Sequence, residues 1–213
     1  MAISEYREYG WKDGAPLEYH QSLIKHMLKF LPIDGTPILD IGCGNGALDN
    51  ELIAMGYNVY GIDASKKGVD IANIRNLGRF YVMDVVNGKL PDILSDIPFR
   101  TVISTEVIEH LYYPRGLIDL AKLALKIGGG GRLIISTPYH GYLKNLLVAL
   151  FNRMDYHFSA LWNGGHIKFW SFKTISVLLR ERGFENIEFK GIGHMYLLWK
   201  QMIVKADISK FDD

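Results

Sequence analysis

Two carboxylates and an imidazole stand close together in the segment ISTEVIEHLYYP, residues 103–114. Glu106, Glu109 and His110 have the spacing i, i+3, i+4, which places three side chains on one face of a helix. Three roles are open for them. They can be acidic residues at a helix start beside an incidental histidine, a general base oriented by a glutamate, or convergent ligands of a divalent cation.

A second stretch with chemical potential is ILDIGCGNGALDNEL, residues 38–52. Gly42, Gly44 and Gly46 fall where an apolar strand turns into a helix, and glycines there permit positive φ angles and close approach of a ligand. The G-x-G-x-G spacing differs from the G-x-G-x-x-G of dinucleotide-binding proteins, which argues against a nicotinamide-dependent dehydrogenase. Asp40, just before the turn, favours a cationic ligand over a phosphate.

These residues need elements that position them, and the apolar pattern predicts alternating strands and helices. Strands are expected at residues 37–42, 57–63, 79–85, 101–105, 132–138, 185–193 and 197–207, and helices at 17–31, 47–56, 66–77, 114–131 and 171–184. The last two strands should pair antiparallel across a short turn. The predicted fold class is α/β, with a doubly wound, mostly parallel seven-stranded sheet and an antiparallel last strand.

In sheets of this kind, ligands bind at the carboxyl ends of the strands. The glycine turn, Asp63, Asp84, Glu106 and the segment after Pro138 all fall at such ends. A carboxylate at the position of Asp63 commonly accepts hydrogen bonds from ribose hydroxyls, and Asp84 could reach the amino group of a base. The sequence therefore predicts one crevice that holds all of these positions.

Size and composition limit the class of protein. The 213 residues suit one domain, and 48% apolar with 22% charged residues is typical of a globular chain. A formal net charge of +1 provides no overall field that would favour nucleic acid. The single cysteine, Cys43, cannot form an internal disulfide. We find neither a signal peptide nor an apolar run of roughly 20 residues, so a cytoplasmic protein without a transmembrane segment is expected.

Taken together, the motifs ILDIGCGNG (38–46), GIDAS (61–65), MDV (83–85), STEVIEHL (104–111) and GGRLIISTP (130–138) resemble those of class I S-adenosylmethionine-dependent methyltransferases. The resemblance implies a Rossmann-like methyltransferase fold, S-adenosylmethionine as cofactor and S-adenosylhomocysteine as product. The residues it assigns to the cofactor are Asp40, Gly42, Cys43, Gly44, Gly46, Asp63, Ala64, Met83, Asp84, Val85 and Thr105. Cys43 is interpreted as a small residue that fits the turn, not as a nucleophile.

A narrower resemblance concerns E-x-x-E-H followed by a distant G-G-H. This pattern is similar to the ubiquinone-biosynthesis O-methyltransferases and to the small-RNA 2′-O-methyltransferases. It implies Glu106, Glu109, His110 and His166 as ligands of Mg²⁺ or Mn²⁺, the first three also being catalytic. We expect an O-methyltransferase that acts on a small hydroxylated molecule, either catechol- or quinol-like or a saccharide or lipid-linked compound. An RNA 2′-O-methyltransferase and a cofactor-binding protein without methyl transfer are the alternatives.

The acceptor should be covered by two segments of the single domain 1–213, an N-terminal segment of about residues 1–33 and an insertion of about residues 139–170. Both are rich in aromatic residues: Tyr6, Tyr9, Trp11, Tyr139, Tyr142, Phe158, Trp162 and Trp170. His140 is expected in the substrate pocket, and His157 is interpreted as a surface or packing residue. The lipophilic stretch NLLVALF could admit a prenyl or acyl tail. The sequence leaves open the acceptor, the metal, the oligomeric state and whether residues 1–15 form a lid.

Overall fold

The computed structural model describes residues 10–17, 20–85, 88–158, 160–162, 164–193, 195–209 and 211. Its strands are β1 (Ile38–Ile41), β2 (Val59–Asp63), β3 (Phe80–Val82), β4 (Thr101–Thr105), β5 (Gly131–Pro138), β6 (Glu185–Ile192) and β7 (Gln201–Ile208). Its helices are α1 (His20–Met27), α2 (Ala47–Ala54), α3 (Lys66–Ala72), α4 (Pro114–Ile127), α5 (Tyr142–Leu150), α6 (Met154–Phe158) and α7 (Phe172–Arg180), with the 3₁₀ helices η2 (Asp92–Leu94) and η3 (Ile108–His110).

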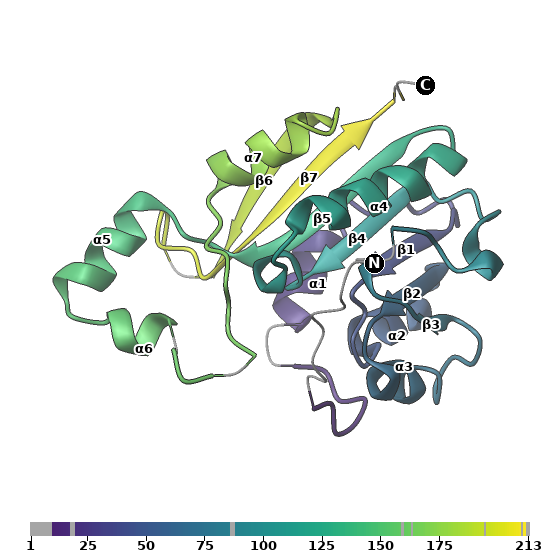
Figure 1. The fold of residues 1–213 in the computed structure, drawn as a ribbon, viewed down its shortest axis with the longest axis horizontal. Helices are drawn as coiled ribbons and strands as arrows, with labels where there is room; N and C mark the ends of the chain where they lie inside the picture. Colours follow the sequence, from purple (N-terminus) through teal and green to yellow (C-terminus); the bar gives the residue numbers. More distant parts are fainter. Residues whose placement is uncertain are drawn as a thin grey trace.

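The strands form one seven-stranded sheet in the order β3-β2-β1-β4-β5-β7-β6 (Figure 1). The five strands from β3 to β5 run parallel, and β7 is antiparallel to both of its neighbours, β5 and β6. The strand order reverses between β1 and β4, where a crevice opens at the carboxyl ends of parallel strands. The predicted fold class is therefore confirmed.

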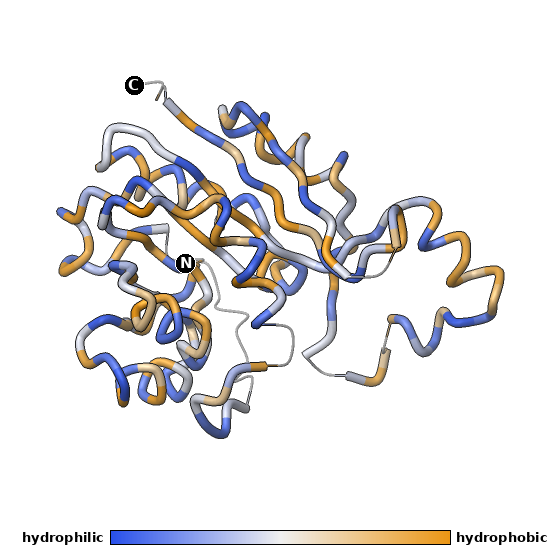
Figure 2. Tube along the Cα trace, turned by 180° about the vertical axis from the view of Figure 1, so that it is seen from behind, coloured by the Kyte–Doolittle hydropathy of each residue, from blue (hydrophilic) through white to orange (hydrophobic). Residues whose placement is uncertain are grey.

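Alternate side chains of the central strands feed two apolar cores, one on each face of the sheet. In β1, Ile38 packs into the core that contains side chains of α1 and α2. Leu39 and Ile41 pack into the larger core that contains side chains of α4 and α7. The strands accordingly appear as an orange interior between helices of mixed colour in Figure 2. This two-sided burial holds the strand ends, and thus the crevice, in fixed positions.

Residues 139–170 contain two helices that the sequence interpretation did not assign, α5 and α6. They project from the carboxyl end of β5, at the left of Figure 1. Neither helix has a buried residue, and large apolar side chains such as Leu150 on α5 and Tyr156 on α6 are exposed. Because neither helix buries a face against the sheet, their apolar residues do not show the periodic spacing from which a helix is predicted.

The last strand was predicted to begin too early. It begins at Gln201 rather than residue 197, because Leu197 has a left-handed φ of 65° and the amide of Leu198 donates to the carbonyl of Met195. This turn interrupts an apolar run that otherwise reads as a continuous strand. Among the residues that the structure describes, we find no helix with the length and hydropathy needed to cross a membrane.

Candidate active site

A cavity of about 1890 Å³ opens at the carboxyl ends of the parallel strands. The glycine turn after β1, the ends of β2 and β4, η3 and parts of residues 138–169 line it. Pockets for a single small ligand usually measure roughly 300–1,000 Å³. The cavity therefore has room for a nucleotide-sized cofactor and a second molecule beside it.

The glycine turn has the backbone conformation that its spacing predicts. Gly44 has a φ of 54°, and a Cβ atom there would lie 2.5 Å from the Trp11 ring. Gly46 has a φ of 67° at the start of α2, and a Cβ atom there would lie 2.5 Å from the Cβ of Ala72. Only glycine fits both positions, since each combines a left-handed φ with a close neighbour.

The residues predicted to bind the cofactor are gathered at this cavity. Asp40, Gly42, Cys43, Gly44, Asp63, Ala64, Met83, Asp84, Val85 and Thr105 line it, and Gly46 lies just outside at the helix start. Asp63 accepts hydrogen bonds from the amides of Gly44 (2.8 Å) and Ser65 (2.7 Å), so its carboxylate joins the turn to the end of β2. Cys43 is buried, and burial raises the pKa of its thiol, which agrees with a packing role.

Sequence reasoning missed a buried carboxyl pair behind the turn. Asp40 is 1% exposed and Asp49, on α2, is fully buried. Within the described part of the chain, no donor group reaches Oδ1 of Asp40 or either carboxyl oxygen of Asp49. Burial, followed by the charge of the other aspartate, holds the pKa of Asp40 well above its usual range. The two neighbouring carboxyl groups perturb each other's pKa, and a buried pair of this kind favours a proton on at least one of them.

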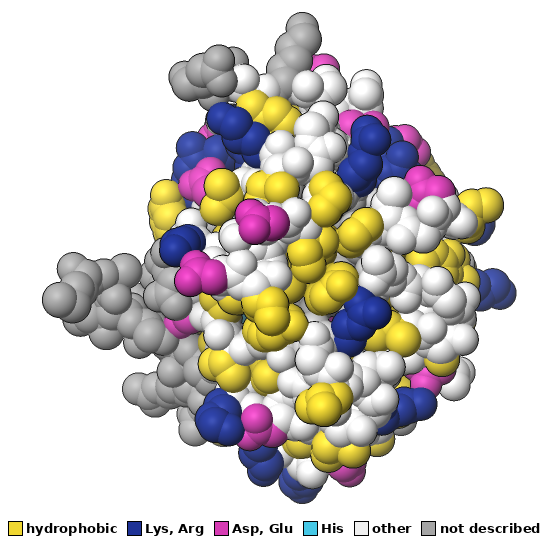
Figure 3. Space-filling model, turned by 90° about the vertical axis from the view of Figure 1, so that its right-hand side faces the viewer, with side chains coloured by type: hydrophobic (Ala, Val, Ile, Leu, Met, Phe, Trp, Pro, Cys, Tyr) yellow, Lys and Arg dark blue, Asp and Glu magenta, His cyan; other side chains and the backbone are white. Residues whose placement is uncertain are grey.

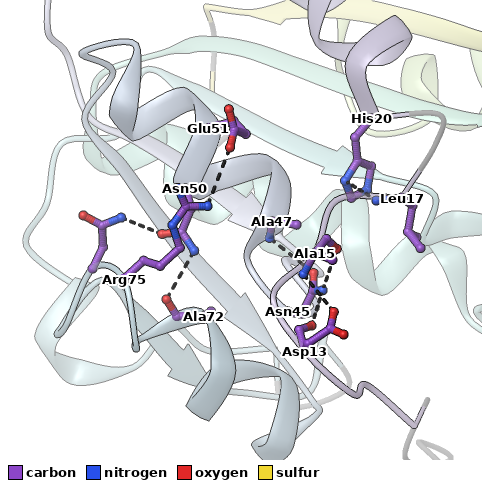
Figure 4. A network of polar contacts seen from close by, with 11 residues as sticks. Asp13, Ala15, Leu17, His20, Asn45, Ala47, Asn50, Glu51, Ala72 and Arg75 are labelled. Atoms are coloured by element: carbon purple, nitrogen blue, oxygen red, sulfur yellow. Dashed lines mark hydrogen bonds and ion pairs between the residues drawn. The ribbon is translucent and has the colours of Figure 1, made fainter.

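The segment of residues 10–17 lies against the glycine turn. Nδ2 of Asn45 donates to the carbonyls of Asp13 (2.8 Å) and Ala15 (3.3 Å), as Figure 4 shows. Its Oδ1 accepts from the amide of Ala47 at the start of α2 (3.2 Å). Trp11 packs over Gly44 and lines the cavity. Of the predicted N-terminal cover segment, residues 1–9, 18 and 19, including Tyr6 and Tyr9, lie outside the described residues.

We expect Asn45→Ala to release this segment from the turn. The substitution removes two part-buried hydrogen bonds to the segment, each worth roughly 0.5–1.5 kcal/mol. Amide hydrogen exchange should accelerate in a peptide that covers residues 10–17, as measured by mass spectrometry. Asn58→Ala is the matched control, because Asn58 bonds Arg79 at the far end of β2. Unchanged exchange in the Asn45 variant would contradict the role given to these bonds.

Glu109, His110 and His166 form a compact group of potential metal ligands. One ligand atom from each lies within 4.8 Å of the others. The carbonyl of Glu109 accepts hydrogen bonds from the amides of Ile167 (2.9 Å) and Lys168 (3.0 Å), and Nδ1 of His110 lies 3.3 Å from the carbonyl of Gly165. These bonds bring the distant histidine to the end of β4, and the His110 and His166 rings lie 4.9 Å apart.

Glu106 does not lie on a helix, so the expectation of one helical face for residues 106–110 is wrong. Glu106 has a left-handed φ of 56°, which is rare for a residue with a side chain and occurs often at functional sites. Its Oε1 accepts from the hydroxyl of Ser136 at 2.8 Å. It lines the cavity beside Glu109 but is outside the compact group.

The electrostatics of the group favour a cation. Burial, followed by the charge of Glu106, holds the pKa of Glu109 well above its usual range. Oε2 of Glu109 accepts from Thr137 (2.9 Å), whereas no described donor reaches its buried Oε1. Burial lowers the pKa of His110, and it lowers that of His166 to about 4. Both imidazoles are therefore neutral at pH 7 and can offer lone pairs.

The other side of the cavity is aromatic. His140, buried after β5, stacks on Phe158 with ring centroids 6.0 Å apart and meets Phe169 edge-on at 5.1 Å. The ring centroids of His157 and His140 lie 5.4 Å apart, and His157 lines the cavity. The sequence interpretation of His157 as a surface or packing residue did not foresee this position. Trp162 also lines this side.

The parallel sheet and the cavity at its carboxyl edge have the arrangement of a nucleotide-binding fold, with space beside the glycine turn for a second molecule. Residues 17–189 match the family described as methyltransferase domain. The chain is 30% identical over 116 residues to a ubiquinone biosynthesis O-methyltransferase from Xylella fastidiosa, a match that covers 54% of this chain and 46% of that protein. A protein of the same name from Cereibacter sphaeroides is 26% identical over 182 residues, which cover 84% and 72% of the two chains.

Solved structures with the same fold are more distant in sequence. A SAM-dependent methyltransferase from Thermotoga maritima superposes with a TM-score of 0.65 at 19% identity, covering 88% of both chains. Magnesium protoporphyrin IX methyltransferase from Synechocystis, with bound SAH, gives a TM-score of 0.60 at 21% identity, covering 90% of this chain and 83% of that one. This chain belongs to the methyltransferase domain family and has the fold of the SAM-dependent methyltransferases, which confirms the predicted class.

Proposed function

We propose that this protein transfers the methyl group of S-adenosylmethionine to a hydroxyl of a small molecule. The observation that carries the proposal is the grouping of Glu109, His110 and His166 within 4.8 Å in the cavity that also contains the glycine turn. A methyl acceptor must be deprotonated beside the cofactor, and this group offers a base and ligands at that position. The relatives are named O-methyltransferases of ubiquinone biosynthesis, which supports oxygen as the acceptor atom.

The cofactor is proposed to occupy the acidic half of the cavity. When bound, S-adenosylmethionine supplies an electrophilic methyl on a positively charged sulfur, whose loss to the acceptor oxygen leaves S-adenosylhomocysteine. Asp63 is positioned to accept hydrogen bonds from ribose hydroxyls, and the glycine turn with Asp40 to meet the methionyl part. Met83, Asp84 and Val85 then frame the base, and Thr105 lies toward the reacting atoms.

His110 is the proposed general base. Its lowered pKa keeps the imidazole neutral at pH 7, and Nδ1 faces the carbonyl of Gly165 at 3.3 Å. Donation from Nδ1 to this carbonyl leaves the lone pair of Nε2 to accept the proton of the acceptor hydroxyl. Held at contact distance from the methyl, the oxygen then needs little further ordering.

A divalent cation bound by the same group is the alternative to a histidine base, because the lone pair of Nε2 of His110 cannot both bind a cation and accept a proton. The set consists of one carboxylate and two neutral imidazoles, with Oε1 of Glu109 lacking a described donor and Glu106 adjacent as a fourth candidate ligand. Such a set suits Mn²⁺, and its carboxylates suit Mg²⁺. A cation there would lower the pKa of an acceptor hydroxyl and hold it in place. Neighbouring buried carboxylates are costly when ionised, and a bound cation would offset that cost.

We expect His166→Ala to abolish or strongly weaken metal binding and to leave cofactor binding unchanged. The affinity for Mn²⁺ should fall more than about tenfold. Loss of a residue that only hydrogen-bonds a metal ligand already lowers metal affinity roughly tenfold, and His166 is itself a proposed ligand. Electron paramagnetic resonance of Mn²⁺, with S-adenosylhomocysteine saturating, measures this. His26→Ala on α1 is the control, since His26 bonds only the carbonyl of Ser22 among described partners.

Methyl transfer itself is tested with labelled S-adenosylmethionine and a panel of catechols, vicinal diols of saccharides and short RNA duplexes. Transfer to a catechol or diol, lost in His110→Ala, supports the proposal. Transfer to RNA alone would assign the chain to the RNA 2′-O-methyltransferase alternative. On the face drawn in Figure 3, basic side chains are interspersed with acidic and apolar ones and form no continuous basic patch of the kind that binds RNA. Tight cofactor binding without transfer to any acceptor would support a cofactor-binding protein that has no methyltransferase activity.

A further inference from the structure

The lining of the cavity includes both carboxyl and ammonium groups. The side proposed for the cofactor carries the carboxyl groups of Asp40, Asp63 and Asp84. The aromatic side carries Lys144 and Lys200, together with the imidazoles of His140 and His157. The carboxyl groups suit a cofactor that carries positive charge, but they do not account for ammonium groups on the side left for the acceptor.

Lys144 is the unusual member of this set. It is half-buried on α5, and its Nζ donates to the carbonyl of Tyr139 at 2.8 Å. No carboxylate among the described residues forms an ion pair with it. Burial, followed by the charge of Lys200, lowers its pKa to about 8, so the ammonium is charged at pH 7. A partly buried ammonium without a counter-ion is costly and is relieved by an anion.

Apart from the carbonyl of Tyr139, the described groups near Lys144 add no negative charge. His140 has its pKa lowered to about 4 and is neutral at pH 7, and burial also lowers the pKa of His157. Both shifts include repulsion from Lys144, which places the ammonium near the two rings. The charge of Lys200 lowers the pKa of Glu106, so this lysine has a carboxyl group nearby. Lys144 is thus the less compensated of the two lysines.

We propose that Lys144 binds an anionic group of the acceptor, either a carboxylate or a phosphate, while the aromatic wall of Phe158, Phe169 and Trp162 contacts its apolar part. An Nζ group has three donors, and the carbonyl of Tyr139 occupies one of them. The remaining donors can form charge-assisted hydrogen bonds. This inference rests on the proposed function, since it names the chemical class of the molecule to be methylated.

The test is calorimetric titration of the full chain, saturated with S-adenosylhomocysteine, with three ligands that share one ring. These are catechol, 3,4-dihydroxybenzoate and 3,4-dihydroxybenzylphosphonate. The wild type should bind at least one anionic ligand about tenfold or more tightly than catechol, the range for a charged hydrogen bond. The benzoate and phosphonate arms distinguish a carboxylate from a phosphate as the natural group.

Three variants decide whether Lys144 carries the preference. In Lys144→Met the ratio of affinities for the anionic and neutral ligands should fall to about one, and Lys144→Arg should retain part of it. Lys173→Met, on the exposed face of α7, should leave the ratio unchanged. Unchanged affinity for S-adenosylhomocysteine verifies that each variant is folded. A wild type that does not prefer either anion, or a preference that survives in Lys144→Met, overturns the proposal.

Methyl transfer to the same ligands separates this inference from the proposed function. Binding of an anionic ligand through Lys144 without its methylation supports the anion site and counts against transfer to catechol-type hydroxyls. If catechol and the anionic ligands are all methylated and all bind with equal affinity, the proposed function is supported and the anion site is overturned.

Discussion

Asp63→Ala should weaken the binding of S-adenosylhomocysteine by roughly a hundredfold or more, because charge-assisted hydrogen bonds are worth roughly 1.5–3 kcal/mol each. The carboxylate of Asp63 accepts from the amides of Gly44 and Ser65 at 2.8 and 2.7 Å. Alanine would therefore lose the proposed ribose contacts and also the bonds that fix the glycine turn relative to the end of β2. Both losses act on the same binding site.

Isothermal titration calorimetry measures this effect directly. Asp63→Asn retains one carbonyl acceptor and a similar volume, so its loss of affinity should be smaller than that of the alanine variant. Asp70→Ala removes an exposed carboxylate whose partner is Lys66 on the surface of α3, and it should bind normally. If Asp63→Ala bound S-adenosylhomocysteine like the wild type, the proposed position of the cofactor would be wrong.

Local chemistry was enough to predict the order of the elements and the edge of the sheet at which the site lies. Short apolar runs identified β1 and β4, and the carboxyl ends of parallel strands necessarily meet at one edge. The projecting helices α5 and α6 could not be predicted in the same way. They have no buried face, so their apolar residues do not follow the period of packing against a core.

The grouping of Glu109, His110 and His166 depends on contacts between distant parts of the chain. The amides of Ile167 and Lys168 donate to the carbonyl of Glu109, and such long-range bonds leave no spacing signal in a single sequence. The backbone at Glu106 is another limit. Glu106 has a left-handed φ of 56°, so residues 106–110 do not form one helix. This conformation could not be predicted from the residue type, because it is uncommon for residues other than glycine.

Asp49 was hidden for a different reason. From sequence, a single carboxylate in a short helix is expected to face solvent. In α2, however, most side chains are buried, so the helix has no clear division into an apolar and a polar face. The tertiary structure places Asp49 against Asp40, and burial raises the pKa of Asp49 from its ordinary 3.8 to about 7. The partner carboxyl can be recognised only once β1 and α2 are in position.

This pair predicts an unusual dependence of stability on pH. An acid whose pKa is raised on folding binds its proton more tightly in the folded state, so its contribution to stability is fully present below pH 3.8 and is lost as the pH rises to about 7. We expect Asp49→Asn to remove this loss, because the amide cannot ionise and can donate to Asp40. Relative to wild type, the variant should gain roughly 4 kcal/mol between pH 4 and pH 8, since each pKa unit corresponds to about 1.4 kcal/mol.

Urea unfolding at several pH values, for the wild type, Asp49→Asn and the surface control Asp70→Asn, measures the difference. The comparison isolates the Asp40–Asp49 pair, because the raised pKa values of Glu106 and Glu109 contribute equally to all three proteins. Parallel stability curves for the wild type and Asp49→Asn would mean that the pair holds no proton. A gain confined to the Asp49 variant would instead identify a destabilising carboxyl beside the glycine turn. A destabilising carboxyl group at this position would be an example of a binding site that lowers the stability of the fold. A cationic methionyl group beside Asp40 would favour the ionised form of the pair.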